Sequence, residues 1–147
     1  DQFMHMNNAS YAVHFEMARW EMGAANGLTA KCFKENIAFI VASSAIRFRK
    51  ELKPQQPFEI HTECHSADER SMHIVQIAKQ GERVYAGQLC RAVLRQGREL
   101  VSPRKVLMEV AGGEEYLPPS SGGGADGDDD GTCMKAALAR LEEGLRG

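Results

Sequence analysis

The chain has 147 residues and a mass of 16.2 kDa, the size of one domain with a short extension. Apolar residues make up 43% and charged residues 26%, which excludes whole-chain disorder and a fibrous repeat. The net charge of −2 argues against a nucleic-acid-binding protein. The longest mostly apolar stretch, residues 37–46, is far shorter than the ~20 residues of a membrane-spanning helix.

The start of the chain and its cysteines bear on location. Because the first residue is Asp1 rather than a methionine, we treat the chain as part of a longer protein, and any targeting segment lies upstream. The four cysteines include no CxxC pair, and a core of this size does not need disulfides. We expect free thiols and a cytoplasmic or other reducing compartment.

The first predicted element is a long helix over residues 7–27. Asn7 or Asn8 can cap its start, and Gly23, Asn26 and Gly27 can end it. Its apolar residues leave little polar face: Tyr11, Phe15, Met17, Ala18, Trp20 and Met22. We expect other structure to cover this helix on most sides.

The hydrophobic period then changes to that of strands. Alternating or β-branched segments predict strands at residues 37–50, 58–65, 71–80, 83–95 and 99–101. Tight turns at 80–82 and 96–98 predict antiparallel hairpins. Ser102 and Pro103 form the cap and first position of a helix that continues to residue 110.

The last part of the chain differs in composition. Residues 118–131 are rich in Gly, Ser and Asp and predict a flexible linker, and residues 132–147 regain helical spacing. We expect this helix to dock on the domain over residues 1–117 or on a partner subunit. The elements together predict the α+β class, with an antiparallel sheet wrapped around one long central helix.

The densest cluster of chemically active residues is the opening segment DQFMHMNNASY. Asp1 and His5 precede a helix N-terminus, whose free amides favour developing negative charge. A carboxylate base beside an amide oxyanion site suits acyl transfer. In the alternative interpretation, Asp1, Asn7 and Asn8 are caps and His5 is a turn histidine.

Two further clusters resemble metal sites without completing one. On a strand over residues 61–65, Cys64 faces away from His61 and His65, and no fourth zinc ligand is indicated. Asp126, Asp128 and Asp130 match the first half of an EF-hand loop, but position twelve is Ala137 instead of a glutamate. We expect no metal.

The motif DxxxHMNNAxY followed by FExAR resembles the hot-dog-fold acyl thioesterases of the 4-hydroxybenzoyl-CoA thioesterase-like group. Within that group it is most similar to the thioesterase superfamily member six proteins. The likeness continues at residues 57–60 and 102–106 and covers about residues 1–110. It implies a hot-dog fold whose first strand precedes Asp1, and a homodimer or dimer of dimers.

The resemblance also implies roles for single residues. Asp1 falls on the catalytic carboxylate, as general base or nucleophile, and His5 on the histidine that follows it. The amides around Asn7 and Asn8 would polarise the thioester carbonyl. Glu51 falls on a second carboxylate of the plant acyl-carrier-protein enzymes, although it also reads as an exposed charge at a strand end. The expected substrate contacts are Phe3, Met6, Tyr11 and Phe15.

The expected activity is hydrolysis of an acyl-CoA to a free acid and CoA, with CoA as part of the substrate and no other cofactor. One alternative is a catalytically inactive hot-dog module that binds acyl-CoA or a protein partner, which the bulky Phe3 near the base favours. A hot-dog hydratase ranks lower, because Phe3 and Met4 replace the Asn and Pro of its D-x-N-P-x-H pattern.

Overall fold

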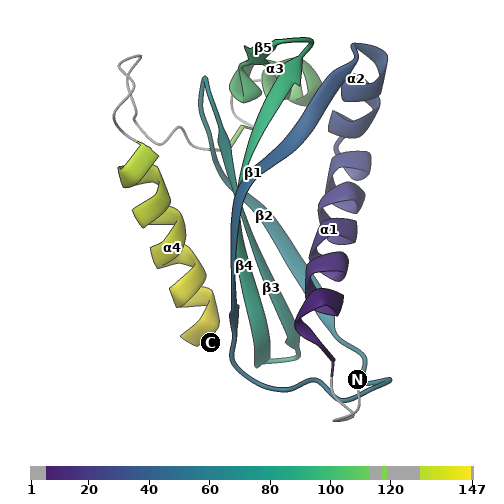
Figure 1. The fold of residues 1–147 in the computed structure, drawn as a ribbon, viewed down its shortest axis with the longest axis vertical. Coiled ribbons are helices and arrows are strands. Elements are labelled where there is room, and N and C mark those ends of the chain that lie inside the picture. The colour runs from purple at the N-terminus through teal and green to yellow at the C-terminus, as the bar shows by residue number, and fades with distance from the viewer. Residues whose placement is uncertain (1–5, 113–116, 119–129, 147) are drawn as a thin grey trace.

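The computed structural model describes residues 6–112, 117–118 and 130–146 (Figure 1). Its centre is an antiparallel sheet of four long strands, β1 (Ile37–Phe48), β2 (Glu59–Ala67), β3 (Met72–Gln80) and β4 (Arg83–Gln96), in the order β1-β4-β3-β2. The short β5 (Glu99–Val101) pairs with β4. The predicted strands and hairpins are confirmed, with ends that differ by a few residues.

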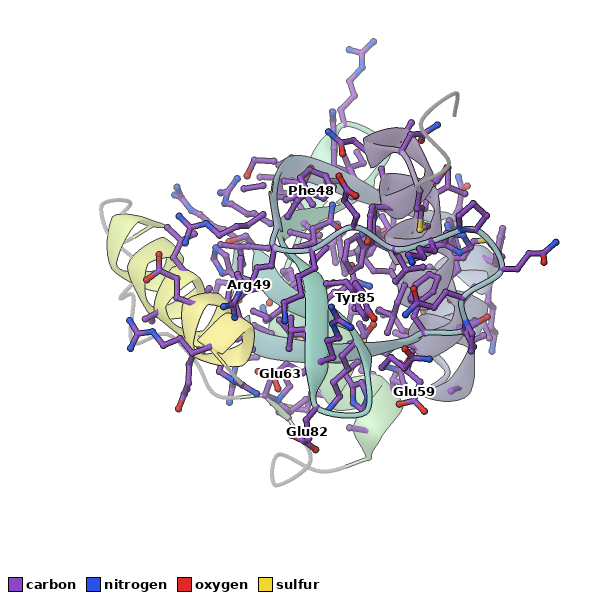
Figure 2. All side chains as sticks on the ribbon, turned by 90° about the horizontal axis from the view of Figure 1, so that it is seen from below. Phe48, Arg49, Glu59, Glu63, Glu82 and Tyr85 are labelled. Atoms are coloured by element: carbon purple, nitrogen blue, oxygen red, sulfur yellow. The ribbon has the colours of Figure 1, made fainter. Side chains whose placement is uncertain are left out.

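Helices lie on both faces of this sheet. The helix α1 (Asn8–Ala25) covers one face, and α4 (Asp130–Arg146) lies on the opposite side of the strands (Figures 1 and 2). The helix α3 (Pro103–Ala111) begins as predicted, because the Ser102 side chain accepts a hydrogen bond from the backbone N–H of Lys105 at 3.2 Å. The predicted α+β class is confirmed.

The sequence analysis assigned no element to residues 28–36, between the long helix and the first strand. A second helix, α2 (Leu28–Lys34), lies between α1 and β1. Gly27 adopts a left-handed φ of 85°, which ends α1, and the Asn26 side chain accepts from the backbone N–H of Leu28 at 3.0 Å. Leu28 and Cys32, one turn apart, then bury against the core and hold the new helix in place.

The helix α1 is less covered than the sequence predicts. Tyr11, Phe15 and Gly23 are its buried residues, whereas Val13, Met17 and Trp20 are 55%, 53% and 49% exposed. Within the described part of the chain, the sheet contacts one side of the helix and leaves an apolar side uncovered.

Both faces of the central strand β3 are buried. Met72, Ile74 and Ala78 pack on the side of α1 and α2, and Val75 and Ile77 pack against α4. This explains why apolar side chains occur on both faces of residues 72–80 and do not alternate strictly with polar ones.

The helix α4 approaches the sheet closely at two glycines. A Cβ on Gly87 would lie 2.6 Å from Cδ1 of Leu141, and one on Gly144 would lie 3.0 Å from Cδ1 of Ile77. Ala137, Leu141 and Leu145 pack against Val75, Val84 and Leu89. The sequence analysis expects this helix to dock on the domain or on a partner subunit. In the structure it packs on the sheet of its own domain.

None of the described helices has the length and apolar character required to span a membrane.

Candidate active site

The candidate site begins at the N-terminus of α1. The Asn7 side chain caps the helix, since its Oδ1 accepts from the backbone N–H of Ser10 at 2.8 Å and from the Ser10 hydroxyl at 3.0 Å. The predicted cap at Asn7 is therefore confirmed. Asn8 is the first helical residue, and the backbone N–H groups of Asn8 and Ala9 have no acceptor within the helix.

The segment between β1 and β2 lies beside this helix start. The backbone N–H of Met6 donates to the carbonyl of Leu52 at 2.8 Å. Leu52 is 3% exposed and packs with Tyr11 and Phe15, which anchors the segment. Glu51, the residue before Leu52, is exposed. The fold thus brings the segment of Glu51 next to the motif.

An open cleft of about 420 Å³ separates the helix start from this segment. The ring of His14, on α1, meets the ring of Phe58 edge-on, with 5.3 Å between their centroids. The cleft is lined by Met6, Asn7, Ser10 and His14 on one side and by residues 52–56 and Phe58 on the other. Of the predicted site residues, Met6 and Asn7 lie on this cleft.

Tyr11 and Phe15 occupy a different position. They are 2% and 0% exposed and belong to an apolar cluster with Leu52 and Tyr85. The ring of Tyr11 also meets Phe48 edge-on at 5.4 Å between centroids. Burial raises the pKa of the Tyr11 hydroxyl, with a further contribution from Tyr85. Their contact with substrate stays a prediction.

Asp1, Phe3 and His5 lie outside the described residues, so their predicted roles also stay predictions.

A polar network beneath α1 was missed by the sequence analysis. Nη1 of Arg19 donates to Oε1 of Gln76 at 2.8 Å and to Oε1 of Gln88 at 2.6 Å. The two glutamines are partners across β3 and β4 and are 0% and 3% exposed. Nε2 of Gln76 donates to the carbonyl of Phe15 at 2.9 Å and to the hydroxyl of Thr62 at 3.0 Å. Two features signal this network in the sequence: Gln76 shares a face with Ile74 and Ala78, and Arg19 follows Phe15 by four residues.

Residues 1–110 match the model of the family described as the thioesterase-like superfamily. The chain belongs to this superfamily. Protein THEM6 of Danio rerio is 31% identical over 109 residues, which are 73% of this chain and 52% of that protein. The chain therefore spans about half the length of this curated relative.

Solved structures of low sequence identity show the same fold. The probable thioesterase YbaW from Escherichia coli is 23% identical with a TM-score of 0.68, covering 76% of this chain and 86% of that one. The hypothetical protein SAV2348 from Staphylococcus aureus, solved in complex with CoA, is 13% identical with a TM-score of 0.67, covering 79% and 77%. The expected hot-dog fold and family are confirmed.

Proposed function

We propose that this domain hydrolyses an acyl thioester and releases a free acid and coenzyme A. One observation carries the proposal: in a chain of the thioesterase-like superfamily, the motif with Asp1 and His5 runs directly into the start of α1. The cleft beside that start offers space for the thioester group. The SAV2348 complex supports CoA as the thiol carrier.

The proposed chemistry needs one base and one oxyanion site. Asp1 takes a proton from water, and the water oxygen adds to the thioester carbonyl carbon. The negative charge that forms on the carbonyl oxygen is stabilised by the backbone N–H groups of Asn8 and Ala9, at the positive end of the α1 dipole. The C–S bond then breaks, and Asp1 passes its proton to the departing sulfur, so that CoA leaves as a thiol.

We further propose that the active form is a homodimer paired along β1. Among the described residues, β1 is an edge strand of 12 residues that pairs only with β4. Its Ile40, Val41 and Phe48 are 37%, 41% and 41% exposed. A long, apolar, unpaired edge invites strand pairing with another chain. A second copy would cover it, together with the exposed apolar side of α1.

The experiment that tests the activity is hydrolysis of short, medium, long and aromatic acyl-CoAs by the protein and by Asp1→Asn. Release of CoA is followed by chromatography, because native thiols would react with a thiol dye. We expect turnover of one substrate class and a loss of roughly 10²-fold or more in kcat for Asp1→Asn, the effect of removing a catalytic base. Glu51→Gln should lower kcat by a smaller factor if Glu51 assists.

The matched control is Glu99→Gln, which removes an exposed carboxylate on β5 and should leave kcat unchanged. Binding of acyl-CoA without any turnover would contradict the proposal and favour the inactive binding module. Equal rates for Asp1→Asn and the unmodified protein would remove Asp1 from the mechanism.

A further inference from the structure

The face of α1 that borders the cleft carries a histidine to which the sequence analysis assigned no role. Asn7, Ser10 and His14 line the cleft together, because residues three and four positions apart share one face of a helix. Along the helix axis, His14 lies about 8 Å from the free N–H groups of Asn8 and Ala9. Side chains of a helix lean toward its N-terminus, so the imidazole leans toward those amides.

The ring of His14 is supported by an aromatic neighbour and has no hydrogen-bond partner. It meets the ring of Phe58 at 5.3 Å between centroids and 85° between planes. Phe58 packs in turn against the buried cluster of Tyr11, Phe15 and Leu52, so the surface that supports the imidazole is anchored. Within the described part of the chain, no hydrogen bond or ion pair engages either ring nitrogen of His14.

His14 differs in this respect from the other histidines that the structure describes. Each of those has a polar partner: His61 contacts Glu59 at 3.2 Å, His65 contacts Glu63 at 3.9 Å, and His73 contacts Ser66 at 3.2 Å. His14 is exposed and borders the cleft. An imidazole whose two nitrogens are both free can give a proton at one and take a proton at the other.

The proposed hydrolysis, on which this inference rests, needs a proton at the sulfur. Breaking the C–S bond leaves an alkyl thiolate, the conjugate base of a thiol with a pKa of roughly 8.5. A cleft solvates this anion less well than bulk water does, which makes the free thiolate a poorer leaving group. A proton donor placed at the sulfur therefore lowers the barrier to bond breaking.

We propose that His14 carries the proton from Asp1 to the departing sulfur. As the C–S bond breaks, one ring nitrogen of His14 gives its proton to the sulfur, and the thiol leaves uncharged. The other ring nitrogen takes the proton that Asp1 removed from water, through a water molecule of the open cleft. The ring ends uncharged, and water has supplied a hydroxyl to the acid and a proton to the thiol.

The identity of the leaving thiol gives a readout that a structural role of His14 would not change. Two thioesters of the acyl group preferred in the acyl-CoA panel are compared, one of CoA and one of thiophenol, whose more acidic thiol leaves readily without a proton. We expect His14→Gln to lower kcat for the CoA thioester by roughly 10²-fold, the usual contribution of a positioned proton donor, and to keep kcat for the thiophenol ester within about threefold.

His61→Gln is the matched control, because His61 is 55% exposed on β2 and lies outside the cleft. It should leave kcat for both thioesters unchanged. Phe58→Leu removes the ring that supports the imidazole and should lower kcat for the CoA thioester by a smaller factor than His14→Gln. Far-UV circular dichroism and the thermal midpoint establish that each variant is folded.

A second measurement needs no substitution: kcat of the unmodified protein is determined for thioesters of thiols of increasing acidity. Because His14 supplies the proton, kcat should rise by less than about threefold across the series. A steep rise would overturn the role of His14 and leave the hydrolysis standing, as would equal losses for the two thioesters in His14→Gln or no loss for either. Absence of turnover by the unmodified protein would instead overturn the proposed function, and this inference with it.

Discussion

At the scale of residues, polar groups decide how α1 sits on the sheet. Gln76 and Gln88 occupy strand positions that face α1 and are fully buried or nearly so. Burying an amide is unfavourable unless it is hydrogen-bonded, and Arg19 supplies that bond to both side chains. Because Gln76 also donates to the carbonyl of Phe15, these contacts join α1 to both β3 and β4.

A second residue-scale property is the acidity of Cys64. Removal from water, with smaller contributions from Asp68 and Glu63, raises the pKa of this thiol to about 12 from the usual 9.0. The thiol therefore stays neutral in the folded state at a pH where the unfolded chain has already lost the proton. Stability from this group is complete below about pH 9 and is lost as the pH rises toward 12.

We therefore expect the free energy of unfolding to fall with pH above about 9 more steeply in the unmodified protein than in Cys64→Ala. The difference in slope should approach 1 kcal/mol per pH unit, the effect of one proton bound differently in the two states. Urea denaturation of both proteins between about pH 7.5 and about pH 10.5 measures this difference. Parallel curves would contradict the neutral thiol.

At the scale of elements, α4 is attached to the sheet by two kinds of contact. Arg140 forms a bidentate ion pair with Glu63 on β2 at 2.9 and 3.1 Å (Glu63 is labelled in Figure 2). Both side chains are about 40% exposed, at 39% and 43%, so water weakens this pair. Leu141, in contrast, is 3% exposed and lies over Gly87.

Burial rather than charge should therefore hold α4. We expect Leu141→Ala to lower the free energy of unfolding by about 2–4 kcal/mol, as for other buried leucines. Arg140→Ala should lower it by less than about 1 kcal/mol. Urea denaturation measures both variants, and Leu138→Ala, at a position 38% exposed on the same helix, serves as the control. A larger effect of Arg140→Ala than of Leu141→Ala would reverse this assignment.

At the scale of the whole molecule, the two sheet faces differ in how they are covered. On one face α4 covers β3 and β4 with its own apolar residues. On the other, α1 leaves Met17 and Trp20 exposed, and within the described part of the chain the outer edge of β1 is unpaired. A second copy is therefore expected at β1, and a dimer of dimers would need a surface other than the one that α4 covers.

We expect size-exclusion chromatography with light scattering to give the mass of a dimer. Val41→Lys should shift the protein toward the monomer, because a charge at this edge strand opposes pairing with another strand. Leu100→Lys is the matched control: Leu100 is an exposed leucine on β5, 57% exposed, and its substitution should leave the mass unchanged. A monomer for the unmodified protein would refute the proposed homodimer.

Local interactions made a large part of the fold predictable. The hairpin turn at Gly81 and Glu82 follows from glycine's access to a positive φ, here 55°. The starts of α1 and α3 follow from the side chains of Asn7 and Ser102, which bond backbone groups three residues away. The alternation of residues 58–65 likewise reports a strand without knowledge of its neighbours.

The sequence by itself determined the class of fold, most element boundaries and the family, because these depend on short-range pattern and on a contiguous motif. Only the tertiary structure decided that Arg19 meets Gln76 and Gln88, that Leu52 bonds to Met6 before the start of α1, and that α4 packs on its own sheet. Each of these contacts joins segments far apart in the chain. A pattern of local propensities says which face a side chain occupies, but which element covers that face is settled only when the strands pair and the helices pack.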